Sequence, residues 1–217
     1  MRIGILSDIH ADPVALCCAI RRLLEHHVHR IVCLGDLVDK GPDDEGVIDT
    51  IRQYCISTVQ GNHDEAAIIR AEGRANVSDG DWERVARSEK KNVLSPAYIS
   101  FLRSLPVTRW AIWEGKRVLM THDGLGVLGF SLDQFHPPKA YKKMLKKSDA
   151  DVVLMGHTHI PTASDYGGIR LLNPGSVCHK RARDSHTVGV LTLPSMDFEV
   201  YAIDSGRAQR TRDIFGA

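Results

Sequence analysis

The sequence predicts an α/β fold, with parallel strands and helices alternating at its start and antiparallel strands near its end. Three short apolar runs, at residues 2–7, 31–34 and 56–59, are separated by two segments with helical periodicity. This β-α-β-α-β order is typical of parallel strands joined by helical crossovers. Hydrophobic residues make up 43% of the chain and aromatic residues only 6%, so the core is expected to be aliphatic, as suits this class.

The two helices that separate these strands can be placed from the sequence. The first is expected from Asp12 to about His27, because Asp12-Pro13 is typical of an N-cap followed by proline in the first helical turn. The second is expected over residues 43–53, where apolar residues recur at helical spacing.

Residues 65–105 differ from the segments around them. They are polar and helical in character and contain no convincing strand, and helices are expected to start at Ser78-Asp79 and Ser95-Pro96. We therefore expect a helical excursion at about 65–105, which serves either as a lid or as a peripheral packing layer.

Further strands and one lysine-rich helix are expected in the second half of the chain. Residues 107–112 and 117–120 form two strands with a turn at Glu114-Gly115-Lys116. The lysine-rich helix follows, and its charges are typical of a solvated face, with attraction of an anionic substrate as the alternative. The remaining strands are expected at 152–155, 169–172, 187–193 and 197–203, and the alternation in the last three suggests antiparallel pairing.

Length and charge limit the possible functions. The 217 residues are enough for a single domain over residues 1–217, and the formal net charge is only +1. A polyanion or a membrane surface is therefore not the expected partner. There is no apolar run of about 20 residues, so no membrane span is expected. The lysine-rich helix is the only basic cluster, so nucleic acid is not an expected partner either. Oligomeric state is left open.

The cysteines and the start of the chain indicate a cytoplasmic protein. The five cysteines are odd in number and form no Cys-x-x-Cys pair, which favours reduced, mostly buried thiols over a disulfide or zinc-thiolate framework. The chain begins directly with a strand, without the apolar core of a signal peptide.

Polar side chains follow five of the predicted strands. The clearest case is Gly61-Asn62-His63-Asp64: glycine lets the chain turn, Asn62 offers an oxygen to a cation, His63 can donate a proton, and Asp64 can hold the local arrangement. Because the carboxyl ends of parallel strands line one sheet edge, we expect these side chains to converge. The others are Asp8, His10, Asp36, Asp39, His122, His157 and His159.

Such a set of side chains predicts a metal centre. Buried polar groups without partners are costly, and cations would compensate them. We expect oxygen and imidazole ligands with no thiolate nearby, which suits Mn²⁺, Fe, Zn²⁺, Co²⁺ or Ni²⁺ and disfavours a cysteine-type structural zinc. Seven candidate ligands are too many for one tetrahedral ion and fit two ions that share a carboxylate.

With these residues the chain resembles the calcineurin-like metallophosphoesterases, in particular their small prokaryotic branch of phosphodiesterases and diadenosine tetraphosphatases. The resemblance covers residues 3–159 and implies a two-sheet mixed β-sandwich flanked by helices, with two metals at the sheet edge. The loop Asn173-Pro174-Gly175-Ser176 is similar to the next motif of that branch. The matching motifs are Asp8-x-His10, Gly35-Asp36-x-x-Asp39, Gly61-Asn62-His63-Asp64, His122 and Gly156-His157-x-His159.

The resemblance also implies a role for each of these residues. Asp8, His10 and His159 would hold one metal. Asn62, His122 and His157 would hold the other. Asp36 would bridge the two ions, of which Mn²⁺ is the expected kind. His63 would act as general acid, and Asp39 would orient and charge it; Asn62 and His63 would also contact the substrate.

Three positions depart from the family pattern. Asp39-Lys40-Gly41 has lysine where the Ser/Thr protein phosphatases have arginine, and lysine lacks the fork that grips a phosphate. Asp123 stands where this branch often has glycine, and Ala11-Asp12 replaces a common Gly-Asn. Arg181, with Arg183, could reach a substrate phosphate or form a solvated loop.

The expected function is that of a metal-dependent phosphoester hydrolase. A metal-bridging hydroxide would attack phosphorus and His63 would protonate the leaving group. The first substrate choice is a phosphodiester of nucleotide type. The alternatives are a dinucleoside polyphosphate, a Ser/Thr phosphoprotein and, in a different class, a role as a non-catalytic metal-binding scaffold.

Overall fold

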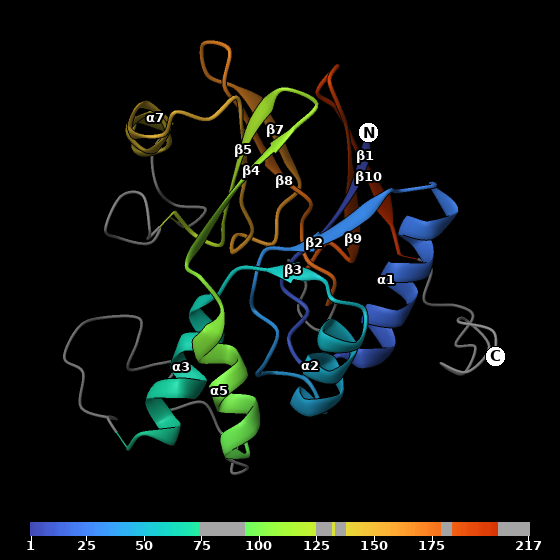
Figure 1. Cartoon of the computed structure of the whole chain (residues 1–217), viewed down its shortest axis with the longest axis vertical. Coiled ribbons are helices and arrows are strands. Elements are labelled where there is room, and N and C mark those ends of the chain that lie inside the picture. The colour runs from blue at the N-terminus through green and yellow to red at the C-terminus, as the bar shows by residue number, and fades with distance from the viewer. Residues whose placement is uncertain (74–93, 125–131, 133–137, 179–183, 204–217) are drawn as a thin grey trace.

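Two five-stranded mixed sheets face each other in the protein, and helices cover their outer faces (Figure 1). The computed structural model describes residues 1–73, 94–124, 132, 138–178 and 184–203. Strand order is β10-β9-β1-β2-β3 in the first sheet and β4-β5-β6-β8-β7 in the second. This arrangement confirms the predicted α/β class with a two-sheet sandwich.

The first sheet contains the parallel strands from the start of the chain. Its members are β1 (Arg2–Leu6), β2 (Arg30–Cys33), β3 (Ser57–Thr58), β9 (Thr187–Thr192) and β10 (Asp197–Ala202). The first three are parallel, and β9 pairs antiparallel with both β1 and β10. The crossovers are α1 (Pro13–Glu25) and α2 (Asp44–Gln53), each capped by an aspartate side chain that accepts a backbone N–H at 2.9 Å.

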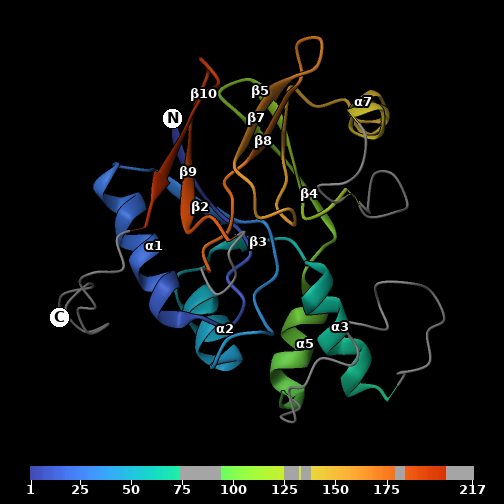
Figure 2. The same ribbon diagram turned by 180° about the vertical axis from the view of Figure 1, so that it is seen from behind.

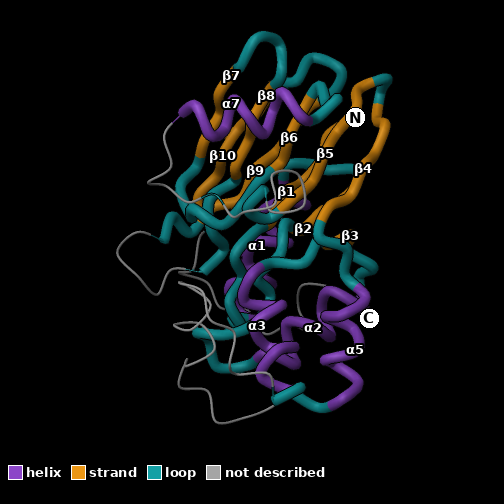
Figure 3. Tube along the Cα trace, turned by 90° about the vertical axis from the view of Figure 1, so that its left-hand side faces the viewer, coloured by secondary structure: helices purple, strands orange, loops and turns teal. Residues whose placement is uncertain are grey.

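The second sheet repeats this arrangement with one helix on its outer face. Its members are β4 (Thr108–Trp113), β5 (Lys116–Thr121), β6 (Val152–Leu154), β7 (Thr162–Asp165) and β8 (Arg170–Asn173). The central strands β5, β6 and β8 are parallel, and β4 and β7 are antiparallel edges. Helix α7 (Pro138–Lys147) lies over the outer face of this sheet (Figure 3). It buries Met144 and Leu145 and exposes its lysines, as expected of a solvated face.

Aliphatic side chains fill the spaces between these layers. One cluster lies between the two sheets and includes Ile5, Val32, Val118 and Leu154. A second lies between the first sheet and helices α1 and α2, and a third lies between the second sheet and α7. Burying each such side chain stabilises the fold by about 1.5–3 kcal/mol, so three apolar layers hold the strand ends in fixed relative positions.

The helical excursion is present in part. Helix α3 (Asn62–Ala71) and helix α5 (Pro96–Ser104) lie side by side (Figures 1 and 2), and Ser95 precedes α5 as predicted. Ile68, Ile99 and Leu102 join the cluster beneath α2, which is the behaviour of a packing layer. The expected helix start at Ser78-Asp79 lies outside the described residues.

The strand predictions are incomplete at two places. Strand β7 is missing from them, because its half-buried and exposed residues contain no apolar run. Residues 169–172 do pair antiparallel, with β7, but β8 is also a buried central strand that is parallel to β6. Side-chain alternation reports which face of a strand is buried and does not report the direction of its neighbour.

The five cysteines are free thiols, and all but Cys55 are buried. Within the described ranges, every helix is too short or too polar to cross a membrane.

Candidate metal centre

The segments that follow β1, β2, β3, β5 and β6 place the predicted side chains close together, beyond the carboxyl ends of these strands. Among them only Asn62 and His157 are partly exposed. Six of these residues have left-handed backbone conformations, with φ from 50° to 71°, which are costly for residues other than glycine. These six are Asp8, His10, Asp36, Asp39, His157 and His159.

The first group of ligand atoms comes from β1 and from the loop after β6. His159 Nε2 lies 3.2 Å from His10 Nε2 and 3.1 Å from Asp8 Oδ1. All three side chains are buried. Two imidazoles and a carboxylate that turn their free atoms toward one point form a set that could hold a divalent cation.

The second group comes from the start of α3 and from the ends of β5 and β6. Asn62 Oδ1 lies 3.0 Å from His122 Nε2 and 3.0 Å from His157 Nδ1. The amide oxygen and the two ring nitrogens again converge, and this group could hold a second cation.

Asp36 stands between the two groups. Its Oδ2 lies 3.6 Å from His10 Nε2 in the first group and 3.4 Å from His122 Nε2 in the second. Its Oδ1 accepts a hydrogen bond from the backbone N–H of His63 at 2.8 Å. One carboxylate therefore faces both groups, as a bridging ligand must.

Two observations indicate that these groups fit cations. Asp8 Oδ1 is buried and makes no well-aligned hydrogen bond within the described part of the chain, although it lies 3.1 Å from His159 Nε2. The ammonium group of Lys40 lies 2.9 Å from His10 Nε2, so a positive charge already faces the first group. A buried acceptor without a donor is costly, and a divalent cation would remove that cost.

His63 lies next to both groups but has a different partner. Its Nδ1 lies 2.8 Å from Asp39 Oδ2, and its Nε2 lies 4.0 Å from Asp36 Oδ2. Because Asp39 accepts the Nδ1 proton, Nε2 is the nitrogen that faces the centre. Such an Asp–His pair is typical of a general acid or base.

Comparison of the sequence with models of known protein families identifies the family. Residues 1–196 match the model of the calcineurin-like phosphoesterase superfamily domain. The chain belongs to this superfamily. It is therefore a hydrolase of phosphate esters, in a family that depends on two metal ions, and the resemblance inferred from the motifs is confirmed.

Relatives of this phosphoesterase include two curated proteins. An uncharacterized protein of Methanocaldococcus jannaschii is 25% identical over 182 residues, which cover 81% of this chain and 69% of that protein. Serine/threonine-protein phosphatase 1 of Salmonella typhimurium is 29% identical over 85 residues, which cover 37% of this chain and 39% of that phosphatase.

Solved structures share the fold. A hypothetical protein of Pyrococcus horikoshii has a TM-score of 0.74 at 15% identity, and a metallophosphoesterase of Sphaerobacter thermophilus has a TM-score of 0.64 at 24% identity. In both comparisons 93% of this chain and 87% of the other chain are covered.

The carboxylate of Asp64 holds the loops of this phosphoesterase together. Oδ1 accepts the backbone N–H groups of Leu37 and Val38, and Oδ2 accepts those of Asp36 and Gly61, at 2.8–3.3 Å. Asp64 thus joins the loop after β2 to the start of α3, as expected. Position 61 requires glycine because there is no room for a side chain: a Cβ there would lie 2.3 Å from Asp36 N. Its backbone conformation does not require glycine, since its φ is −98°.

Two residues near the ligands were not predicted. Asp184 Oδ1 accepts the Nδ1 proton of His159 at 2.6 Å, and its side chain is buried. Cys178 lies beside the same histidine, which corrects the expectation that no thiol is near the ligands. Nothing in the spacing of Asp184 or Cys178 relative to the motifs marks them, because a loop brings them there. The predicted substrate-binding residue Arg181 lies outside the described residues.

Burial and mutual attraction set the charges of the ligands. Burial alone would raise the pKa of Asp8 and Asp36, but the His159 and His122 imidazoles outweigh it and lower both. Burial alone would lower the pKa of His122, but Asp36 outweighs it and raises this pKa to about 10. The pKa of His159 is raised in the same way by Asp8. Without metal, His122 and His159 therefore hold protons, which a cation would have to displace if these residues were its ligands.

Metal binding should consequently release protons. His122 and His159 are protonated below their raised pKa values, and a metal can bind only after the proton leaves Nε2. The apparent dissociation constant for metal is expected to rise about tenfold for each unit by which the pH falls, for each proton released. Adding metal to weakly buffered, metal-stripped protein with a pH indicator measures this release. A pH-independent affinity without acidification would contradict the prediction.

Replacing Asp184 by asparagine is expected to weaken metal binding by about 10- to 100-fold, the usual effect of losing a carboxylate that orients a ligating histidine. The reason is that an asparagine amide can still orient the His159 ring, but it lacks the negative charge that makes His159 Nε2 a stronger metal ligand. Equilibrium dialysis measures the loss. Asp197→Asn, a change in the exposed hairpin at Ser195, is the control and should bind metal like the unmodified protein.

Proposed function

We propose that this phosphoesterase hydrolyses phosphodiesters of nucleotide type, with His63 as the general acid. The observation that carries the proposal is the Asp39–His63 pair beside two ligand groups that share Asp36. A proton donor next to a site for two cations is the arrangement needed to expel an alkoxide from phosphorus.

The assignment of metal ligands follows the two groups. Asp8, His10 and His159 would hold one ion; Asn62, His122 and His157 would hold the other; Asp36 would contact both. Two divalent ions, when bound, would supply an activated water and neutralise charge on the phosphate. Mn²⁺ stays the expected ion, with Fe, Zn²⁺, Co²⁺ and Ni²⁺ as alternatives.

Side chains would carry out the proton transfer and help to bind the phosphate. His63 gives its Nε2 proton to the leaving oxygen, and the Asp39 carboxylate stabilises the positive charge that the ring carries before transfer. Lys40 is exposed and its ammonium group lies at the edge of the first ligand group, so it can pair with a phosphate oxygen. Lysine does so as a point charge, without bidentate geometry.

A cavity of about 200 Å³ that reaches Thr158 supports a nucleotide-type ester. It is lined by apolar side chains and by Tyr141 and Tyr166, and its polar lining includes Thr158 and Asn173. Thr158 lies between the ligands His157 and His159, and Asn173 donates hydrogen bonds to Gly156 O and Thr158 Oγ1. The tyrosine rings of a cavity that reaches Thr158 are suited to stacking on a base.

A Ser/Thr phosphoprotein is the second candidate. The local likeness to the Salmonella phosphatase favours it, although that match covers 37% of the chain. A dinucleoside polyphosphate has the same phosphate chemistry and fits the same cavity argument. The scaffold alternative is disfavoured because the chain keeps His63 and all seven candidate ligands.

The deciding experiment is a turnover assay on metal-stripped protein refilled with Mn²⁺, Co²⁺ or Zn²⁺. A nucleotide phosphodiester, a dinucleoside tetraphosphate and a phosphopeptide are compared at equal concentration. Preference for the diester supports the proposal, and preference for the phosphopeptide replaces it by the second candidate. Full metal uptake without turnover of any ester would favour the scaffold.

A further inference from the structure

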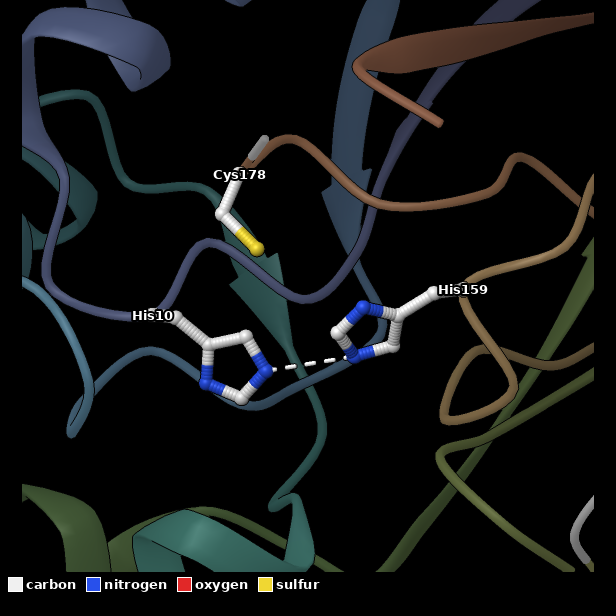
Figure 4. A group of neighbouring side chains, drawn as sticks. All are labelled: His10, His159 and Cys178. Atoms are coloured by element: carbon white, nitrogen blue, oxygen red, sulfur yellow. Dashed lines mark hydrogen bonds between the residues drawn. The ribbon is translucent and has the colours of Figure 1, made fainter. Parts of the chain in front are cut away.

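The thiol of Cys178 faces the first ligand group. Figure 4 shows its sulfur directed toward the space between the rings of His10 and His159. Ligand atoms of these three residues lie within 4.8 Å of one another, and all three residues are buried. A cation with metal–nitrogen bonds of about 2.0–2.1 Å and a metal–sulfur bond of about 2.3 Å would contact all three side chains after these atoms draw slightly closer together.

The backbone fixes Cys178 in this place. Its N–H donates to Asp8 O at 3.2 Å, and the N–H of the preceding residue, Val177, donates to Ser7 O at 2.9 Å. Its own carbonyl accepts the hydroxyl of Ser176 at 3.1 Å. The chain around Cys178 is thus bonded to the end of β1, the same segment that provides Asp8 and His10.

Two independent features indicate that a cation belongs beside the sulfur. Asp8 Oδ1 is fully buried and, within the described ranges, makes no well-aligned hydrogen bond; its near neighbour is His159 Nε2, at 3.1 Å. The Sγ–H of Cys178 donates to Asp184 Oδ2 at 3.4 Å, and Oδ1 of the same carboxylate binds His159. Cys178 and His159 therefore share the Asp184 carboxylate as a common acceptor. Asp8 Oδ1, which makes no well-aligned hydrogen bond within the described ranges, faces the other nitrogen of the His159 ring.

We propose that Cys178 is a further ligand of the metal held by Asp8, His10 and His159, and that this sulfur makes that one site selective for thiophilic divalent cations. The proposal rests on the proposed function for the existence of the metal centre. It adds a residue to the ligand set and gives the two sites different metal preferences. Sulfur ligands select Zn²⁺, Co²⁺ or Fe²⁺ over Mn²⁺, which prefers oxygen.

Binding of the sulfur involves a simple exchange. A metal–sulfur bond forms, and the thiol proton leaves to solvent, with Asp184 Oδ2 as its first acceptor. No oxidant or reductant is needed, because the metal stays divalent. The second site, made of Asn62, His122 and His157, contains no sulfur and should keep the ordinary preferences of oxygen and imidazole ligands.

The test uses Co²⁺ as a spectroscopic probe of the whole chain. Metal-stripped protein is titrated with Co²⁺, and metal content and near-ultraviolet absorption are recorded together. A sulfur-to-cobalt charge-transfer band that grows with the binding of one equivalent is expected. Binding of two equivalents without this band would overturn the proposal and leave the metal centre intact. Failure to bind any Co²⁺ would instead contradict the proposed function.

Matched variants identify the sulfur. Cys178→Ser is expected to bind two Co²⁺ ions without the band, while Cys17→Ser, a change at a buried cysteine of α1, keeps it. Cys178→Ser should also lose about 10- to 100-fold in affinity for Zn²⁺ at one site, the range caused by loss of a partner around a metal, with a smaller change for Mn²⁺. A band that persists in Cys178→Ser would contradict the proposal even if the variant is less stable.

Discussion

Replacing His63 by alanine is expected to lower the turnover of phosphodiesters with poor leaving groups by about 10²- to 10⁴-fold, the usual contribution of a general acid. The Nε2 of His63 faces the centre, while its Nδ1 is bound to Asp39 at 2.8 Å. Without this ring an alkoxide must leave without a proton. Metal content should stay at the unmodified level, because His63 belongs to neither ligand group.

The leaving group provides the internal control for this variant. A nitrophenyl diester, whose leaving oxygen needs no proton, should be hydrolysed by His63→Ala at nearly the unmodified rate. Asp39→Asn should show an intermediate loss, because it keeps a partner for the ring and removes the charge. Equal losses on both esters would indicate that His63 acts in binding, and unchanged turnover of the alkyl ester would remove it from the mechanism.

Replacing Asp64 by alanine is expected to lower the free energy of unfolding by about 4 kcal/mol or more and to abolish tight metal binding. Four backbone N–H groups lose their acceptor, and each buried donor without a partner costs about 1–3 kcal/mol. Stability and metal binding are expected to fall together, because Asp64 bonds the backbone of the loop that presents Asp36. Urea unfolding and equilibrium dialysis measure the two effects separately.

Asp165→Ala is the matched control for this variant. Its carboxylate accepts one N–H, from Gly168, in an exposed hairpin, so its loss should cost only about 0.5–1 kcal/mol. Metal binding should not change. A comparable small loss in Asp64→Ala would show that the two loops are held mainly by packing.

The order of strands and helices could be predicted because the apolar runs of this chain are short and separated by clear helix starts. The convergence of the candidate residues could be predicted because they follow strands closely, as Asp8 follows β1 and His122 follows β5. Parallel strands bring such positions to one edge by geometry alone.

The parts that could not be predicted depend on loops and on polar edges. Asp184 and Cys178 reach the ligands because their loop bonds to the end of β1, and no periodicity in the sequence records that contact. Strand β7 has no buried apolar residue to mark it. The role of Gly61 as a place of close approach to Asp36 is likewise visible only when both loops are seen together.

The left-handed conformations of the site residues have a consequence for protein engineering. Each of the six residues from Asp8 to His159 gives up about 1–2 kcal/mol of backbone energy that glycine would not lose. A library selected for thermal stability alone would therefore accumulate glycine and asparagine at these positions, and its variants would lose activity while gaining stability. A screen for a more thermostable enzyme should leave these six residues unchanged and vary the outer faces of α1 and α7.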